Sequence, residues 1–149
     1  MAKDVTYKPK TNLALKTLYS IGLANNTISN STHTYIKTTG LNPTQYAIVD
    51  ILGHNGPMKI SEIYNMMLIK SGNKTMILDS IEKKGYIRRV FSKSDRREII
   101  IELTSAGQKF FTQNYKAYGE FVEKTLSVLT QSEQKELLAL LGKINTPAE

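Results

Sequence analysis

The side chains with the most distinctive chemistry lie in two short segments, residues 71–75 and 93–97. The first segment contains Ser71, Gly72, Asn73, Lys74 and Thr75. Asparagine pairs with adenine through two hydrogen bonds, lysine donates to guanine or a phosphate, and threonine offers a hydroxyl and a methyl to thymine. Gly72 lets a backbone approach a phosphate closely, which the positive end of a helix dipole favours. At the start of a helix, these residue types suit the edges of bases in a DNA major groove.

The second segment contains Lys93, Ser94, Asp95, Arg96 and Arg97. Guanidinium groups are attracted into narrow minor grooves, where negative potential is concentrated. Asp95 would be repelled by phosphate, so we expect it to orient an arginine through a paired hydrogen bond. Lys93, Arg88 and Arg89 suit phosphate contacts better than base reading.

Each segment also has a simpler interpretation. Ser71 can be only a helix N-cap and Asn73 only an exposed polar residue. Residues 93–97 can be a solvated turn, in which a surface ion pair contributes about 0–1 kcal/mol.

Positive charge is concentrated around the same two segments. The chain of 149 residues has a formal net charge of +7. Residues 70–97 hold nine basic and three acidic residues, a net charge of +6, while the remaining residues are nearly neutral. A basic excess confined to one stretch is typical of a phosphate-binding surface, although a solvated charged face is the alternative.

Local signals predict four helices before residue 85. The spacing of leucine and isoleucine predicts a helix over residues 11–38. Asn42, Pro43 and Gln45 form a start signal for the next one, which ends before residue 54. Residues 59–67 predict a short helix, and another is expected from residues 71–73 to Lys84, with Gly85 as its left-handed stop. Two short helices joined by a tight turn make a helix-turn-helix.

A hairpin and two helices are expected to follow. Residues 86–91 and 99–103 are rich in β-branched and aromatic residues, which predicts a hairpin with a basic tip. We interpret Tyr86 and Phe91 as its core. A helix is predicted from about 105 to 129, and Thr130-x-x-Glu133 is a capping box for the last helix.

The predicted fold is mainly α with a small β-hairpin wing: a winged helix-turn-helix with N- and C-terminal dimerisation helices. We expect one structural domain, divided into dimerisation residues 1–40, a DNA-binding module over 41–104 and dimerisation residues 105–149. The terminal helices carry more apolar surface than a compact central module can cover. A second copy of the chain is the expected partner, giving a homodimer.

Composition excludes several classes of function. The chain has no cysteine, so disulfides, thiolate zinc sites and thiol redox sensing are excluded. His33 and His54 are the only histidines, and without a His/Cys cluster we expect no metal. We find no nucleophile elbow, no phosphate-cradling glycine loop and no credible pair of catalytic carboxylates, so we expect no enzyme and no cofactor. No apolar run approaches the ~20 residues that span a bilayer, and we expect a cytoplasmic protein.

Residues 71–97, SGNKTMILDSIEKKGYIRRVFSKSDRR, followed by Leu103-Thr104-x-x-Gly107, resemble the MarR family of winged-helix regulators. The resemblance extends over roughly residues 10–145. It implies a homodimeric repressor bound to a pseudo-palindromic operator and released by a small effector. Ser71, Gly72, Asn73 and Thr75 resemble a branch that responds to quinones, phenols and related electrophiles. Lys74 and Met76 depart from the family pattern on the reading helix, so the resemblance does not give the operator sequence.

The resemblance also implies an effector pocket between the dimerisation helices and the reading module, for a small phenolic, quinone or other apolar molecule. Its candidate polar groups are Tyr19, His33, Tyr46 and Tyr115, each of which can also be an ordinary half-buried or surface residue.

Two other functions compete with a regulator that binds double-stranded DNA. A winged-helix module that contacts another protein would show no salt-sensitive DNA binding. An RNA-binding protein would stack bases on exposed aromatic residues. The basic segment offers only Tyr86 and Phe91 for stacking, and because we interpret both as hairpin core, duplex DNA is favoured.

Overall fold

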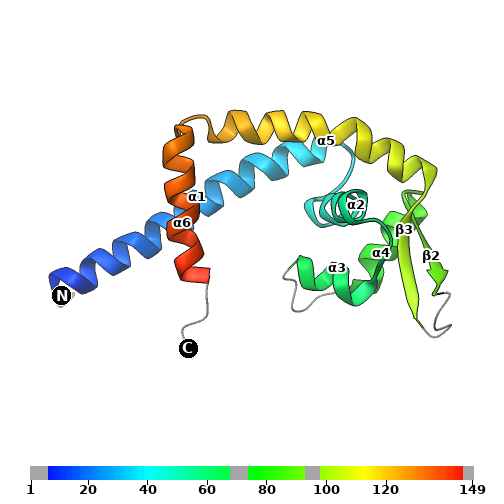
Figure 1. Cartoon of the computed structure of the whole chain (residues 1–149), viewed down its shortest axis with the longest axis horizontal. Helices are drawn as coiled ribbons and strands as arrows, with labels where there is room; N and C mark the ends of the chain where they lie inside the picture. Colours follow the sequence, from blue (N-terminus) through cyan, green and yellow to red (C-terminus); the bar gives the residue numbers. More distant parts are fainter. Residues whose placement is uncertain (1–6, 68–73, 93–97, 146–149) are drawn as a thin grey trace, which may run out of the picture. The chain divides into compact units, whose positions relative to one another are not determined.

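A computed structural model of the chain describes residues 7–67, 74–92 and 98–145. The chain forms two compact units, Met1–Tyr46 and Ala47–Glu149, whose helices and strands are drawn in Figure 1. The division into residues 1–40, 41–104 and 105–149 stays a prediction.

The first unit holds the long helix α1 (Pro9–Thr38) and the start of α2 (Pro43–Asn55). Helix α1 is continuous, through the polar stretch in its second half as well. The capping box before α2 is confirmed, because Gln45 N donates to Asn42 Oδ1 at 2.9 Å and Asn42 N donates to Gln45 Oε1 at 3.1 Å. Many apolar side chains of α1 are exposed.

The second unit continues through β1 (Met58–Lys59), α3 (Ile60–Met66) and α4 (Lys74–Lys83). Gly85 ends α4 with φ +78°, as its position predicts. Helices α3 and α4 are the two helices of the predicted helix-turn-helix, and the first three residues of the predicted reading helix, 71–73, lie outside the described residues.

The sheet has three antiparallel strands in the order β1-β3-β2. Strands β2 (Ile87–Phe91) and β3 (Ile99–Leu103) are the predicted hairpin. With the residues between them they are called the wing below. Strand β1 pairs with Ile100 and Ile101 of β3 and was not predicted, since two residues are too few to show an alternating pattern.

Helices α5 (Ser105–Leu126) and α6 (Gln131–Asn145) complete the chain. The predicted capping box before α6 is confirmed, with Thr130 N donating to Glu133 Oε2 at 2.7 Å. This hydrogen bond and one from the Thr130 hydroxyl lower the pKa of Glu133. No described residue of α6 is buried, and four of its large apolar side chains are exposed: Leu137, Leu138, Leu140 and Ile144.

The core of the second unit lies where α2, α3 and α4 meet the sheet. Helix α4 packs on β2, while α3 packs on β1 and β3. The most deeply buried side chains include Ile48, Ile63, Leu78, Ile81, Ile87 and Ile101. At about 1.5–3 kcal/mol for each fully buried large apolar side chain, this cluster is the main source of stability for the wing and α4.

The interpretation of Phe91 as hairpin core is wrong. Its side chain is 72% exposed, whereas Tyr86 is half-buried and packs on Phe110 with ring centroids 4.8 Å apart. Alternation along β2 places Phe91 on the same face as the buried Ile87, but the core ends before the strand does.

None of the described helices is long and apolar enough to cross a membrane.

The turn from the wing into α5 depends on a close backbone approach. Thr104 Oγ1 accepts from Gly107 N at 3.0 Å and donates to Gly85 O at 2.5 Å, and Thr104 N donates to Tyr86 O at 3.0 Å. A Cβ added at Gly107 would lie 1.9 Å from the Tyr86 carbonyl oxygen. This contact explains the glycine of the Leu103-Thr104-x-x-Gly107 motif, because no other residue fits against this backbone.

Gly107→Ala should lower the free energy of unfolding by about 2 kcal/mol or more, since the atom in the way belongs to the backbone. Gly119→Ala on the same helix is the matched control. A Cβ there meets nothing within 4 Å, so better helix propensity should raise stability by about 0.5–1 kcal/mol. Denaturant unfolding measures both values, and equal effects at the two positions would contradict the close approach.

Candidate nucleic-acid interface

Most of the predicted DNA contacts fall where the structure makes no statement. Seven of the eleven residues lie outside the described residues: Ser71, Gly72 and Asn73, together with Lys93, Ser94, Asp95 and Arg97. Arg96 lies outside them as well, and the side chain of Lys74 is not described although the residue begins α4. Thr75 and Arg88 are described, and both are exposed.

Helix α4 has one buried and one exposed face. Leu78 and Ile81 are buried against the rest of the second unit, as predicted for the reading helix. Thr75, Met76 and Asp79 are exposed. The described first turn of α4 therefore presents side chains to solvent, as a helix that enters a major groove requires.

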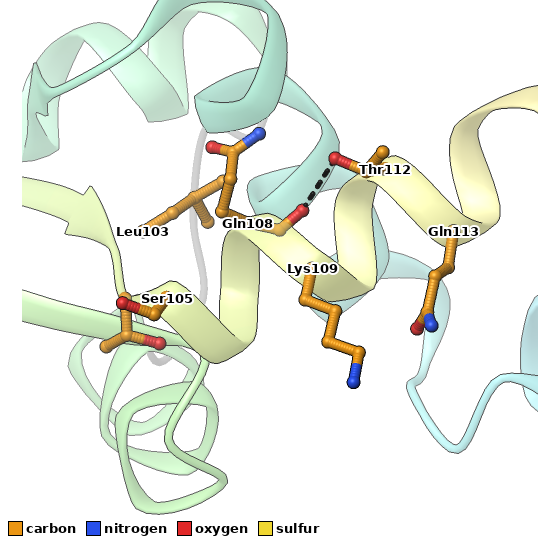
Figure 2. Close-up of a pocket in the computed structure, with 7 residues that line it drawn as sticks. Leu103, Ser105, Gln108, Lys109, Thr112 and Gln113 are labelled. Atoms are coloured by element: carbon orange, nitrogen blue, oxygen red, sulfur yellow. Dashed lines mark hydrogen bonds between the residues drawn. The ribbon is translucent and has the colours of Figure 1, made fainter.

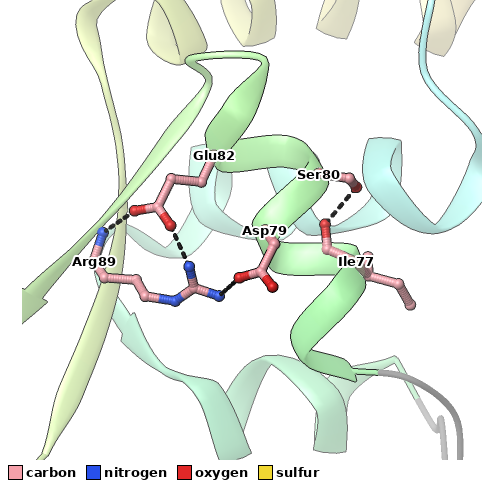
Figure 3. A network of polar contacts seen from close by, with 5 residues as sticks. All are labelled: Ile77, Asp79, Ser80, Glu82 and Arg89. Carbon is pink, nitrogen blue, oxygen red and sulfur yellow. Dashed lines mark hydrogen bonds and ion pairs between the residues drawn. The ribbon is translucent and has the colours of Figure 1, made fainter.

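Arg89 ties the wing to α4 (Figure 3). Its guanidinium donates to Asp79 Oδ1 at 2.6 Å and also to Glu82 Oε2, and its backbone N–H donates to Glu82 Oε1 at 3.1 Å. The Arg89 side chain is 25% exposed. Charge-assisted hydrogen bonds from one planar guanidinium to two carboxylates fix direction as well as distance.

This geometry corrects the interpretation of Arg89 as a phosphate contact. Both acidic residues of α4 face Arg89, so its charge is compensated within the module and its described role is to position the wing. Sequence reasoning missed the pairing because residues 79, 82 and 89 are not neighbours in the chain. The signal that would have revealed it is the presence of acids on the helix of an otherwise basic segment.

Arg88 points to the other face of the same strand, as the alternation of a β-strand requires. Its Nε donates to Glu102 Oε1 at 2.5 Å, across the β2–β3 pair, and its side chain is 64% exposed. A phosphate contact by Arg88 stays a prediction.

A second ion pair supports the base of the wing. Lys59 Nζ lies 2.6 Å from Glu98 Oε1, and Lys59 N donates to Glu62 Oε2 at 2.9 Å. A small open hollow of about 290 Å³ lies beside this pair, lined by Lys59, Ile60, Ser61, Glu98 and Ile99. The pair joins β1 to the start of β3 by a charged contact in addition to the ladder.

A larger open hollow of about 620 Å³ lies along the first turns of α5 (Figure 2). It is lined by Leu103, Thr104, Ser105, Gln108, Lys109, Thr112 and Gln113. Thr112 Oγ1 donates to the Gln108 carbonyl at 2.9 Å, so this hydroxyl is bonded within its own helix. None of the four predicted effector residues lines this hollow.

The predicted effector residues have different environments. Tyr19 and His33 are exposed on α1, and Tyr46 is buried on α2. Tyr115 is exposed on α5 and packs on Phe111 and His54. The pocket implied by the resemblance stays a prediction.

His54 belongs to an aromatic cluster of the second unit. Its ring meets Phe111 and Tyr115 edge to face, with centroids 5.0 and 5.6 Å apart, and its Nε2 lies 3.6 Å from Asp50 Oδ1. Burial raises the pKa of Asp50, against the opposing charge of His54, and burial together with Asp50 raises the pKa of Tyr118. Among the described residues, no group of three or more His, Cys, Asp and Glu side chains is placed to hold a metal ion.

Comparison with known proteins identifies the family. The family model described as MarR family matches residues 41–99. The uncharacterized HTH-type transcriptional regulator YkoM of Bacillus subtilis (strain 168) is 32% identical over 107 residues, which cover 72% of this chain and 70% of the relative. The chain belongs to the MarR family. The regulator MhqR of the same organism is 26% identical over 139 residues, covering 93% of this chain and 96% of that relative.

Solved structures of the MarR family share the fold. A mutant MarR from Escherichia coli complexed with operator DNA matches with a TM-score of 0.80 at 20% identity, covering 91% of this chain and 97% of that one. A probable transcriptional regulator from Pseudomonas aeruginosa matches with a TM-score of 0.72 at 24% identity, covering 83% and 96%. The predicted fold class, a mainly α winged helix-turn-helix with additional helices, is confirmed.

Replacing Arg89 should cost more stability than replacing Arg88. Arg89→Ala leaves two carboxylates without their shared partner and should lower the free energy of unfolding by about 1–3 kcal/mol. Arg88→Ala removes an exposed pair and should cost less than about 1 kcal/mol. Chemical denaturation of the two variants provides the test, and a cost at Arg88 as large as that at Arg89 would refute the positioning role.

Asp50→Asn should raise the free energy of unfolding at pH 7. Because burial raises the pKa of Asp50 in the folded state, the ionised carboxylate destabilises that state, and the amide removes the charge while keeping the size. The gain should shrink as the pH falls toward the unfolded pKa of about 3.9, where the wild-type carboxyl is protonated in both states. Thermal unfolding at pH 7 and pH 4 measures the difference. A less stable variant at pH 7 would mean that the contact with His54 outweighs burial.

Proposed function

We propose that the chain is a homodimeric, sequence-specific regulator of transcription that binds double-stranded DNA through α4 and the wing. The observation that carries the proposal is the position of the net +6 charge of residues 70–97, which belong to the exposed reading helix and the wing that Arg89 holds beside it. An operator duplex offers phosphates to that charge and base edges to the helix.

The comparisons support this proposal. MarR of Escherichia coli and MepR of Staphylococcus aureus have each been solved as DNA complexes. The curated relatives reported above are transcriptional regulators by name. No catalytic step is part of the proposal, and a regulator of transcription works beside the chromosome, which places this one in the cytoplasm.

Within this function, the direct contacts are the predicted ones. Asn73, Lys74 and Thr75 read base edges, with Ser71 and Gly72 at the helix start. Arg96 and Arg97 enter the minor groove with Asp95 orienting them, and Lys93, Ser94 and Arg88 lie against the phosphates.

The second copy covers apolar surface on the terminal helices. Exposed leucine and isoleucine side chains on α1 and α6 provide that surface, among them Leu13, Leu18, Leu138 and Ile144. A two-fold dimer presents two reading helices about one helical turn of DNA apart, which matches an inverted repeat.

Repression is the proposed direction of control. The HTH-type transcriptional repressor MdtR of Bacillus subtilis is 30% identical over 110 residues, covering 74% of this chain and 71% of that relative. Occupying a promoter blocks transcription without a further contact to polymerase. A small phenolic, quinone or other apolar effector, bound near Tyr19, His33, Tyr46 and Tyr115, would release the repressor by changing the spacing of the two reading helices.

Selection of bound duplexes from a random pool tests the proposal directly. An inverted repeat should be enriched, and affinity should fall steeply as salt rises, because bound phosphates release counterions. A chain that remains monomeric, or that prefers no duplex over a neutral control protein, would rule out this function. A protein-interaction module without DNA binding would then be the better interpretation.

Asn73→Ala should blur base preference, and Arg97→Ala should weaken binding to all operator variants. Each loss should amount to about 1–3 kcal/mol at the affected contact. Lys116→Ala is a matched control, since it removes one positive charge from an exposed position on α5. Titration of operator variants by fluorescence anisotropy gives the relative affinities, and unchanged base preference in Asn73→Ala would exclude direct reading by that side chain.

A further inference from the structure

The wing carries an exposed apolar pair that charge does not account for. Phe91 is 72% exposed and Ile99, its partner in the β2–β3 register, is 37% exposed. They are the last residue of β2 and the first of β3. Large apolar side chains that face solvent on a narrow hairpin lose the benefit of burial, which favours a contact with another molecule.

The ladder brings these two side chains close together. Thr104 N donates to Tyr86 O at 3.0 Å and Ser92 N donates to Glu98 O at 2.9 Å, so both pairs are of the hydrogen-bonded kind. Pairs alternate along an antiparallel ladder, so Phe91 and Ile99 form a pair of the other kind, in which side chains lie closest. The two side chains thus form one apolar surface, next to the Ser92–Glu98 pair that leads into residues 93–97.

The direction of this surface follows from Arg89. Cross-strand partners and every second residue of a strand share a face, so Phe91 and Ile99 lie on the face from which Arg89 reaches α4. Strand β2 runs beside α4 from its C-terminal end, where Tyr86 N donates to Ile81 O, toward its N-terminal end (Figure 3). The apolar surface therefore faces the side on which α4 presents its first turn.

We propose that Phe91 and Ile99 form an apolar contact with the deoxyribose rings of bound duplex DNA, beside the groove that the wing enters. The inference rests on the proposed function. Sugars form the walls of the minor groove, and apolar side chains are used at that groove by other DNA-binding proteins. The pair lies one residue pair from the segment that carries Lys93, Arg96 and Arg97, so phosphates held by that charge bring their sugars to this surface.

An apolar contact has a signature that distinguishes it from a charged one. Its loss lowers affinity without changing the slope of log K against log salt, because no counterion is released by an apolar side chain. Loss of a phosphate contact lowers that slope by about 1. Burial of apolar surface also makes the heat capacity change of binding negative, so its loss makes that change less negative.

Phe91→Ala tests the proposal in the full-length chain, with the duplex enriched by the selection above as the probe. We expect affinity to fall about five- to tenfold, with an unchanged salt slope and a less negative heat capacity change. Phe91→Leu should recover most of the affinity. Val128→Ala, which truncates an 85% exposed apolar residue between α5 and α6, should bind like wild type.

Each other outcome overturns the inference. Wild-type affinity in Phe91→Ala, while wild type itself binds the duplex, refutes the apolar contact and leaves the proposed function intact. A reduced salt slope in Phe91→Ala means that phosphate contacts were lost through a displaced wing. Dissociation of the Phe91→Ala dimer in sedimentation assigns the pair to a second copy, and tighter binding of single strands than of duplex by wild type assigns Phe91 to base stacking. Failure of wild type to bind any duplex refutes the proposed function itself.

Discussion

Arg89 is held between two carboxylates of α4, and the relation of the wing to the reading helix depends on this arrangement. The guanidinium is largely buried, so it requires compensating charge, and Asp79 and Glu82 provide it from successive turns of the helix. Apolar contacts among Ile81, Ile87 and Ile101 hold helix and strands together, but they are not directional. The hydrogen bonds of Arg89 add the direction.

This arrangement also explains the acids within the basic segment. Asp79 and Glu82 would oppose phosphate if they faced DNA, yet both are directed at Arg89. Their negative charge is used inside the module. The segment thus supports the wing and remains positive overall, since nine basic residues outnumber three acidic ones.

The start of α5 is coupled to the wing just as closely. Thr104 bonds to the backbone of Gly85 and Tyr86, and Gly107 leaves no room for a side chain against the Tyr86 carbonyl. A displacement of the first turns of α5 therefore moves the wing with it, because packed backbones cannot absorb the strain. In the proposed mechanism, a change in the dimer helices reaches the reading module through this junction.

The sequence by itself determined the elements whose signals are local. Asn42 with Gln45, Thr130 with Glu133, and Gly85 set helix ends within a few residues, and alternation predicted β2 and β3. The concentration of positive charge in residues 70–97 was also readable without a structure. Only the tertiary structure decided that Arg89 faces α4, that Phe91 is exposed and that β1 joins the sheet. These depend on which face of a strand meets the helix and where the core ends, and both are set by contacts between residues far apart in the chain.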